Sequence, residues 1–271
     1  HITKKVADKL AEMLKNDRAD FESKWDDLQV FVQYGTLSEE KFAEKAKNFS
    51  LLKSTDGTYS TIEEYKDKIA ALQTDKDGKT VVLYTNNTEL QYGFVKKANE
   101  RGYDVLSFES PLTPHWISKM EQTFENLTFA RVDADTLDKL IQKEEEIPSK
   151  LSKEDEEKLK PVFEGALKEK EKFTVQFESM SPSESPVIIT QPEFIRRMME
   201  QQRMGGFFGA FPERYNIVVN SNHEKISAIL AASGEEQSKK VKQLTDLALL
   251  SQGMLTGEAL NAFVERSMEL V

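Results

Sequence analysis

The chain has 271 residues, a length that makes two compact units the expectation. Asp and Glu outnumber Lys and Arg by 47 to 37, which argues against a general nucleic-acid binder because phosphate neutralisation requires a surplus of cations. Cysteine is absent, so disulfides, thiol nucleophiles and thiolate metal sites are excluded, and no apolar run reaches the length of a transmembrane helix.

The N-terminal part of the chain is expected to be helical. Residues 1–6 show neither an initiating Met nor a signal-peptide pattern, so we expect a piece of a longer protein. Apolar residues then recur at helical spacing from Val6 to Val32 and predict a helical segment over residues 1–57.

Two features divide this helical segment. Gly35 is expected to end one helix, and Ser38 to cap the next. The dipeptide Asp56-Gly57 predicts a turn, which closes the segment.

Residues 58–147 alternate between helical periodicity and short apolar runs. The runs at 81–84, 104–108 and 129–132 have the length and composition of buried strands. Because single helices separate them, they predict βαβ units and a parallel sheet. We therefore expect a small three-layer α/β/α domain here, and an α/β fold class (α+β overall) for the whole chain.

A domain boundary is predicted at Ile147-Pro148-Ser149, which interrupts a run of charge. Residues 148–271 are expected to form a mixed α+β domain. A charged helix early in this domain contains Pro161, which predicts a kink or a break. The strands are expected at 175–177, 187–189 and 215–219, and the last helices at 235–253 and 257–270.

No motif for catalysis or cofactor binding is complete. Asp77-Gly78-Lys79-Thr80 resembles the end of a phosphate-binding loop, but Gln73 occupies the position of the first required glycine. Gln73 also stands at the first ligand position of a calcium loop built on Asp75 and Asp77. The histidines are far apart, and no Ser lies in a Gly-x-Ser-x-Gly sequence. We therefore expect no catalytic residue, no cofactor and no metal in this chain.

The stretch from Phe194 to Phe211 crowds Met, Phe and Arg together and then breaks into glycines. A helix over residues 192–204 would carry Phe194, Ile195, Met198 and Met199 on one side and the arginines on the other, with Gln202 inside the apolar side. Packing of the apolar side on its own domain is the plain interpretation. Methionine and an amphipathic design favour the alternative, a surface that accepts varied partners. Phe207 and Phe208, on a glycine-rich loop, would extend that surface.

Trp116 is a second candidate for a binding residue. It lies at the start of a predicted helix, directly after a strand end. A buried indole between sheet and helix is one interpretation. A ligand contact near the carboxyl edge of the parallel sheet is the other.

The last two helices are apolar over a wide arc. Two such helices from each of two chains would form a four-helix bundle, and a symmetric homodimer is the commonest assembly. The residues expected in this dimer interface are Leu244, Leu247, Leu250, Leu255, Leu260, Phe263, Val264 and Met268.

Several specific motifs occur in order along the chain. They are Lys24-Trp25-Asp26-Asp27, Phe31-Val32-Gln33-Tyr34-Gly35, Leu52-Lys53-Ser54-Thr55-Asp56-Gly57, Glu63-Glu64-Tyr65, Arg131-Val132-Asp133 and Leu247-Ala248-Leu249-Leu250-Ser251-Gln252-Gly253-Met254-Leu255. In these motifs the chain closely resembles the middle and C-terminal domains of the heat-shock protein 90 chaperone family, in its bacterial form.

The resemblance implies an ATP-driven, homodimeric, cytoplasmic chaperone of the stress response. The chain would begin inside the middle domain, so ATP, Mg²⁺ and the catalytic arginine would belong to upstream parts of the full-length protein. Residues 1–57 and 58–147 would then form the end of the middle domain, and 148–271 the dimerisation domain. The partners implied are a second copy, unfolded or partly folded client proteins and a heat-shock protein 70 type chaperone, with neither nucleic acid nor membrane among them.

In the bacterial family, client contacts are attributed to a tryptophan-bearing helix and to an apolar-faced helix of the C-terminal domain. Trp116 and Lys119 resemble the first, while Gln201 and Gln202 replace apolar residues in the second. The client-binding residues expected here are Trp116, Lys119, Phe194, Ile195, Met198, Met199, Phe207 and Phe208.

Two other functions compete with this interpretation. An α/β enzyme acting on a phosphorylated small molecule would use the loops that follow residues 85 and 108. A peripheral membrane protein would use the arginine-rich helix, but the acidic chain around it disfavours contact with anionic lipid.

Overall fold

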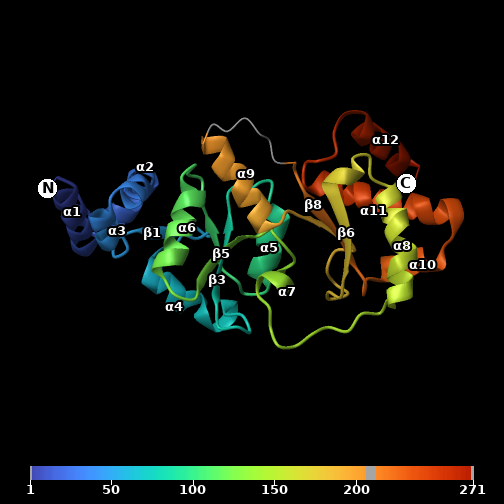
Figure 1. Cartoon of the computed structure of the whole chain (residues 1–271), viewed down its shortest axis with the longest axis horizontal. Helices are drawn as coiled ribbons and strands as arrows, with labels where there is room; N and C mark the ends of the chain where they lie inside the picture. The colour runs from blue at the N-terminus through green and yellow to red at the C-terminus, as the bar shows by residue number, and fades with distance from the viewer. Residues whose placement is uncertain (1, 206–211, 270–271) are drawn as a thin grey trace. The chain divides into compact units, whose positions relative to one another are not determined.

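The computed structural model describes residues 2–205 and 212–269, and the chain divides into two compact units (Figure 1). Helices hold 55% of the residues and strands 15%, in small parallel and mixed sheets, which confirms the α/β class. The chain passes between the units more than once, so the boundary expected beside Ile147 stays a prediction. The first unit contains the described residues up to Val132, Leu140–Gln142 and the end of a helix from Glu200, and the second contains Asp133–Lys139, Lys143–Met199 and the described residues after 211.

Three helices open the first unit: α1 (Ile2–Asn16), α2 (Arg18–Ser38) and α3 (Glu40–Ala46). Asp17 separates the first two and caps α2, because its side chain accepts a hydrogen bond from the N–H of Asp20. The apolar stripe predicted from the sequence, including Phe21 and Trp25, packs with residues of α1 and α3 into one buried cluster.

α2 continues through Gly35, so the predicted helix end is wrong. A Cβ atom on Gly35 would lie 2.8 Å from the ring of Phe42 in α3, so the glycine allows the two helices to pack closely. Ser38 is the last residue of α2, and Glu39 occupies the N-cap position of α3, which corrects the predicted cap.

A short antiparallel hairpin follows, made of β1 (Leu51–Lys53) and β2 (Tyr59–Thr61). Its turn contains the predicted Asp56-Gly57 pair, with Gly57 at a φ of 87° that favours glycine. The two strands are absent from the sequence prediction because three residues are too few to show alternation.

The rest of the first unit is the predicted α/β/α arrangement. Strand β3 lies between β4 and β5 and is parallel to both, which confirms the parallel sheet. Val82 and Tyr84 of β3 share a core with residues of α4 and α6, and Figure 1 shows α5 on the other side of the sheet. The elements are α4 (Ile62–Gln73), β3 (Thr80–Thr85), α5 (Tyr92–Glu100), β4 (Val105–Ser107), α6 (Thr113–Thr123) and β5 (Leu127–Arg131). The short helix α7 (Leu137–Leu140) follows, and all of it but Leu140 belongs to the second unit.

The second unit has a three-stranded mixed sheet in the order β6-β8-β7, with β8 parallel to β6 and antiparallel to β7. All three strands lie where the sequence predicted them. The elements are α8 (Lys153–Gly165), η1 (Lys170–Lys172), β6 (Phe173–Glu178), β7 (Val187–Thr190), α9 (Glu193–Gly205), β8 (Tyr215–Asn220), α10 (Glu224–Ala231), α11 (Gly234–Ser251) and α12 (Gly257–Met268).

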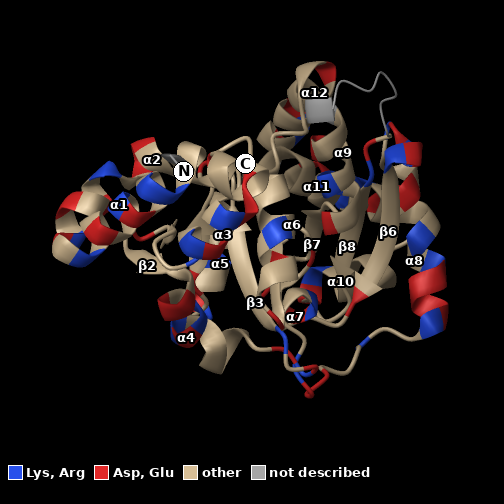
Figure 2. Cartoon of the chain, turned by 60° about the vertical axis from the view of Figure 1, so that its left-hand side comes forward, with Lys and Arg blue, Asp and Glu red and all other residues tan. Residues whose placement is uncertain are grey.

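Helices cover the second sheet and carry most of the charge. Pro161 lies inside α8, which nevertheless continues to Gly165. Apolar residues of α8, α10 and α11 pack with the sheet into one cluster that includes Phe163, Ile217 and Val241. Figure 2 shows acidic and basic residues spread over the helices, whereas the strands of this sheet consist mostly of other residues.

Candidate functional site

Helix α9 presents an aromatic side chain to solvent and turns an arginine inward. Phe194 is 71% exposed, whereas Arg196 is 3% exposed. Glu193 Oε1 accepts hydrogen bonds from Nη2 of Arg196 at 2.5 Å and from Nε of Arg197 at 2.7 Å. The ion pairs allow the charged side of the helix to face the protein, since a buried cation requires a partner. The sequence alone does not show this orientation.

The electrostatics of this first turn follow from the same cluster. Burial raises the pKa of Glu193, but the charges and hydrogen bonds of Arg196 and Arg197 outweigh burial and leave that pKa below its usual value. Glu193 therefore stays ionised at neutral pH and holds both arginines.

The other residues predicted on α9 are less exposed than Phe194. Ile195, Met198 and Met199 are half-buried, so part of the apolar side packs on the chain itself. Gln201 is exposed and Gln202 half-buried. The predicted contacts Phe207 and Phe208 lie outside the described residues.

The carboxyl edge of the parallel sheet, where an α/β enzyme would bind its ligand, is lined by polar groups that bind one another. Gln91 Oε1 accepts two hydrogen bonds, one from Thr85 Oγ1 at 2.5 Å and one from the N–H of Asn86 at 3.2 Å. Arg131 Nη1 lies 3.9 Å from Glu200 Oε1 of α9 and 3.5 Å from Asn86 Oδ1. These groups tie the loop after β3 and the end of α9 to the sheet.

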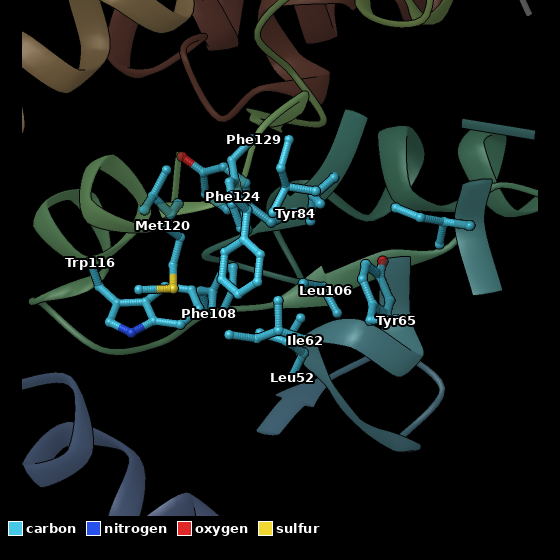
Figure 3. Close-up of a cluster of buried hydrophobic side chains, with 14 residues drawn as sticks. Leu52, Ile62, Tyr65, Tyr84, Leu106, Phe108, Trp116, Met120, Phe124 and Phe129 are labelled. Carbon is cyan, nitrogen blue, oxygen red and sulfur yellow. The ribbon is translucent and has the colours of Figure 1, made fainter. Parts of the chain in front are cut away.

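Trp116 is a core residue and not a surface residue (Figure 3). It is 2% exposed, and its ring centroid lies 5.7 Å from that of Phe108 and 6.1 Å from that of Phe129. Of the two interpretations of this tryptophan, the structure has the buried indole. Lys119, one turn later, is half-buried. The indole is therefore buried within the first unit, and the client contact expected of Trp116 stays a prediction.

A polar network joins α11 to α12. The buried carboxylate of Asp246 accepts hydrogen bonds from Arg266 Nη2 at 2.7 Å and from the ammonium of Lys242. Arg266 Nε donates to Gln243 Oε1 at 2.8 Å, and Gln243 Nε2 donates to Ser267 Oγ at 3.0 Å. Because Arg266 and Ser267 belong to α12 and the other three residues to α11, the network fixes the two helices to each other.

The eight residues expected in the dimer interface fall into three groups. Leu255 and Phe263 are buried within the second unit, and their role in the interface stays a prediction. Leu244 and Leu260 are half-buried. The remaining four are exposed apolar residues, called together the α11–α12 face below: Leu247 and Leu250 on α11, and Val264 and Met268 on α12.

A hollow of about 420 Å³ lies beside the start of α12 and is lined by three lysines. Each lysine has an acidic partner: Lys168 lies 3.3 Å from Glu258, Lys172 pairs with Glu169, and Lys242 pairs with Asp246. Since the cations are paired, the hollow offers little net positive charge to a phosphate group.

One exposed feature was missed from the sequence. Phe31 and Tyr34 are both exposed on α2, and Leu37 continues the stripe. The sequence contains the signal for this stripe, because Phe31 and Tyr34 are three residues apart and therefore lie on one side of a helix. Phe31 directly precedes the core residue Val32.

Across the described parts of the chain, residues 2–205 and 212–269, no cluster of His, Asp or Glu has the arrangement of a metal site. Over the same residues, no helix has both the length and the apolar character needed to cross a membrane.

Comparison with known proteins shows clear relatives, although no protein-family model matches the chain. The chaperone protein HtpG of Porphyromonas gingivalis is 38% identical over 341 residues, covering 100% of this chain and 50% of that protein. HtpG of Bacteroides fragilis is 35% identical with the same coverage, and HtpG of Bdellovibrio bacteriovorus is 24% identical over 93% of the chain and 41% of its own length.

The matched region of the first two relatives is longer than the 271 residues of this chain, so they carry additional segments within it. The motifs and the relatives point to the same family. The chain therefore belongs to the HtpG chaperones, the bacterial form of the heat-shock protein 90 family, and it spans about half the length of the curated relatives it matches.

Proposed function

We propose that this chain is the dimer-forming and client-binding half of an HtpG chaperone, corresponding to the C-terminal half of its relatives. The membership of the family supports the chaperone role. In the full-length protein, ATP hydrolysis with Mg²⁺ would take place in other domains, in the cytoplasm, and a heat-shock protein 70 type chaperone would be a partner. This half would act through its surfaces and not as an enzyme.

The proposed dimer rests on one observation, the exposed apolar residues of the α11–α12 face. Leu247 and Leu250 lie one turn apart on α11, as do Val264 and Met268 on α12, so each helix presents an apolar stripe. The Asp246–Arg266 pair holds the two helices together as one surface. Exposed apolar stripes of this kind are typical of protein–protein interfaces. In a two-fold symmetric dimer, the second copy presents the same surface to the first.

The dimer is tested by placing charge on the α11–α12 face. A Leu247→Glu and Met268→Glu double variant should weaken self-association about 30-fold or more, because centrally buried contacts carry most of the binding energy. Leu90→Glu is the matched control, since Leu90 is 47% exposed and Leu247 45% exposed. Sedimentation equilibrium measures the dissociation constant. A parent that is monomeric, or a double variant that dimerises like the control, would contradict the proposed interface.

Client binding is carried by the exposed side of α9. Phe194 projects from a turn whose charged residues are held inward by Glu193, so an aromatic ring is available to unfolded chains. The half-buried Met198 and Met199 add flexible apolar surface beside it.

Phe194→Ser should reduce protection of an aggregating model protein. Since burial of a Phe side chain contributes about 1.5–3 kcal/mol, about tenfold more of the variant should be needed for half-maximal protection. Tyr92→Ser is the matched control, because Tyr92 is 66% exposed on α5. Light scattering measures aggregation, and circular dichroism checks folding. Equal protection by both folded variants would argue against α9.

The competing enzyme interpretation makes a different prediction. A phosphorylated ligand bound at the loops after β3 and β4 would give a heat of binding with a nucleotide or inorganic phosphate in calorimetry. We expect none from this chain, because Arg131 is engaged with Glu200 and the lysines beside α12 are paired.

A further inference from the structure

Helix α2 presents an apolar stripe to solvent in the first unit. The stripe, called the α2 stripe below, consists of Phe31, Tyr34 and Leu37, which are 72%, 65% and 36% exposed. These residues follow one another at a spacing of three, so they lie along one side of the helix. The buried residues of α2, including Trp25 and Val32, lie on the other side and belong to the core of the three N-terminal helices. The α2 stripe is therefore separate from that core.

An unpaired carboxylate lies at the first end of the α2 stripe. At about 100° per residue, Asp27 falls between Phe31 and Tyr34 around the helix, and one turn before Phe31 along it. Lys24, on the same side, is paired with Asp20 at 2.5 Å. The carboxylate of Asp27 has no hydrogen-bond or ion-pair partner among residues 2–205 and 212–269. It is therefore available to a cation from outside.

The second end of the α2 stripe is also acidic. The chain passes from α2 into α3 through Glu39 and Glu40, which are both exposed. Neither carboxylate has a partner in the described parts of the chain. One exposed cation, Lys41, follows them. Three unpaired carboxylates therefore flank the stripe, with one lysine beside them, and the local charge is negative.

This arrangement matches one class of partner, a segment that carries arginine or lysine beside apolar side chains. The faces of the Phe31 and Tyr34 rings attract a cation placed above them. The carboxylates at the two ends attract cations of the same segment and steer its approach. A second copy of this chain would bring identical carboxylates, so it is repelled. Anionic lipid and nucleic acid are repelled for the same reason.

We propose that the α2 stripe is a docking surface for a basic amphipathic segment of another protein. Apolar side chains of that segment cover the stripe, and its cations pair with Asp27 at one end and with Glu39 or Glu40 at the other. The exposed apolar surface is small, so the contact is weak and reversible. The stripe belongs to the first unit, whereas Phe194 and the α11–α12 face belong to the second. The proposal therefore rests on neither the dimer nor the client surface.

The test measures binding of a fluorescent helical peptide that carries leucines on one side and arginines beside them. Fluorescence anisotropy with the whole chain should show saturable binding. In two matched peptides, every arginine is replaced by glutamine or by glutamate, and both should bind at least about fivefold more weakly. An arginine peptide that does not bind saturably, or a glutamine peptide that binds as tightly, overturns the proposal.

Tyr34→Ser removes the central ring of the α2 stripe and should weaken binding of the arginine peptide about tenfold. Tyr92→Ser is the matched control, because Tyr92 is 66% exposed on another helix of the first unit, and it should bind like the parent. Circular dichroism checks folding, and Phe31→Ser carries the same prediction if Tyr34→Ser does not fold. Equal affinities of the two folded tyrosine variants overturn the assignment to α2.

The charges are tested by a double variant that preserves side-chain size. Asp27→Asn with Glu40→Gln should weaken binding of the arginine peptide about fivefold and reduce its dependence on salt. Asp67→Asn with Glu109→Gln is the control, since both residues are exposed in the first unit and have no ion pair among the described residues. The two double variants have the same net charge. Equal affinities would assign binding to the overall charge of the chain and overturn the proposal.

Three further outcomes would assign the α2 stripe or the peptide differently. Phe194→Ser should bind the arginine peptide like the parent, and a loss of binding would place the peptide on the client helix. Sedimentation equilibrium of Tyr34→Ser should match the parent, and reduced self-association would assign the stripe to a second copy. Binding of the parent to phosphatidylserine vesicles that Tyr34→Ser abolishes would assign it to lipid. Each of these three results overturns the proposal.

Discussion

Asp104 joins α4 to the residue that follows β1, and it shows how one residue can organise a core. Its Oδ1 accepts from the hydroxyl of Ser54 at 2.7 Å and from that of Tyr65 at 2.9 Å, and its Oδ2 pairs with Lys68. The N–H of Asp104 donates to Gln73 Oε1 at 2.6 Å. Burial, followed by the negative charge of Asp104, raises the pKa of Tyr65 well above its usual value, so this phenol stays protonated as a donor.

Asp104→Ala should lower the free energy of unfolding by about 2–4 kcal/mol, because it leaves two buried hydroxyl groups without an acceptor. Urea denaturation at neutral pH measures the change. Asp67→Ala is the control on α4, where an exposed carboxylate should contribute no more than about 0.5 kcal/mol. A loss of stability no larger than that of the control would mean that Asp104 does not organise this cluster.

Individual side chains also show where sequence reasoning stops. Phe194 and Trp116 were both plausible contacts, but one is exposed and the other is packed between Phe108 and Phe129. The position of an aromatic residue on a helix wheel gives its angle to its neighbours and not the direction of the core. Gly35 shows the same limit, since a glycine that ends a helix and one that allows close packing look alike in sequence.

At the scale of elements, α2 is fastened to the start of α4 by one arginine. Arg18 donates to Glu64 through Nη1 at 2.7 Å and Nη2 at 2.8 Å, and through Nε to Glu22 at 2.7 Å. Glu64 also accepts from the N–H of Thr61 in a capping box that begins α4. The hydrogen bonds from Arg18, followed by that from Thr61, lower the pKa of Glu64 from 4.5 to about 2.

This lowered pKa makes part of the stability depend on pH. Glu64 contributes stability while it is ionised in both states, above its unfolded pKa near 4.5, and the contribution is lost as pH falls toward the folded value of about 2. Because the side chains of Arg18 and Glu64 are 43% and 48% exposed, solvent screening limits the contribution to about 1 kcal/mol.

Glu64→Gln should therefore lower the free energy of unfolding by about 1 kcal/mol at pH 7 and have little effect near pH 2. Denaturation curves across this pH range measure the difference from the parent. Glu63→Gln is the control, since Glu63 also lies in the first turn of α4 but is paired with a lysine, Lys66, at 3.5 Å. A Glu64 effect that is the same at both pH values would contradict this assignment.

The sequence predicted correctly those elements that have long apolar patterns or that form buried strands. The three strands of the parallel sheet and the three of the second sheet lie where apolar runs predicted them. The hairpin β1–β2 was missed because its strands have three residues each. Helix α10 has eight residues and was also missed, because two helical turns show little periodicity.

For the molecule as a whole, the residues proposed for dimer formation and for client binding both belong to the second unit. The α11–α12 face belongs to the second unit, and its exposed leucines, valine and methionine form the surface on which we expect a second copy. Helix α9 is divided between the units, with Glu193 to Met199 in the second and its end from Glu200 in the first.

The fold class, the order of the main strands and helices, and the family could all be predicted from the amino-acid sequence. Apolar periodicity records which residues prefer burial, and family motifs survive as residue strings, so both can be read without coordinates. The inward-facing sides of the amphipathic helices are known only from the folded structure. Arg196 is buried and paired with Glu193, whereas Phe194 on the same helix is exposed. Burial depends on partners from distant parts of the chain, and a local pattern does not contain them.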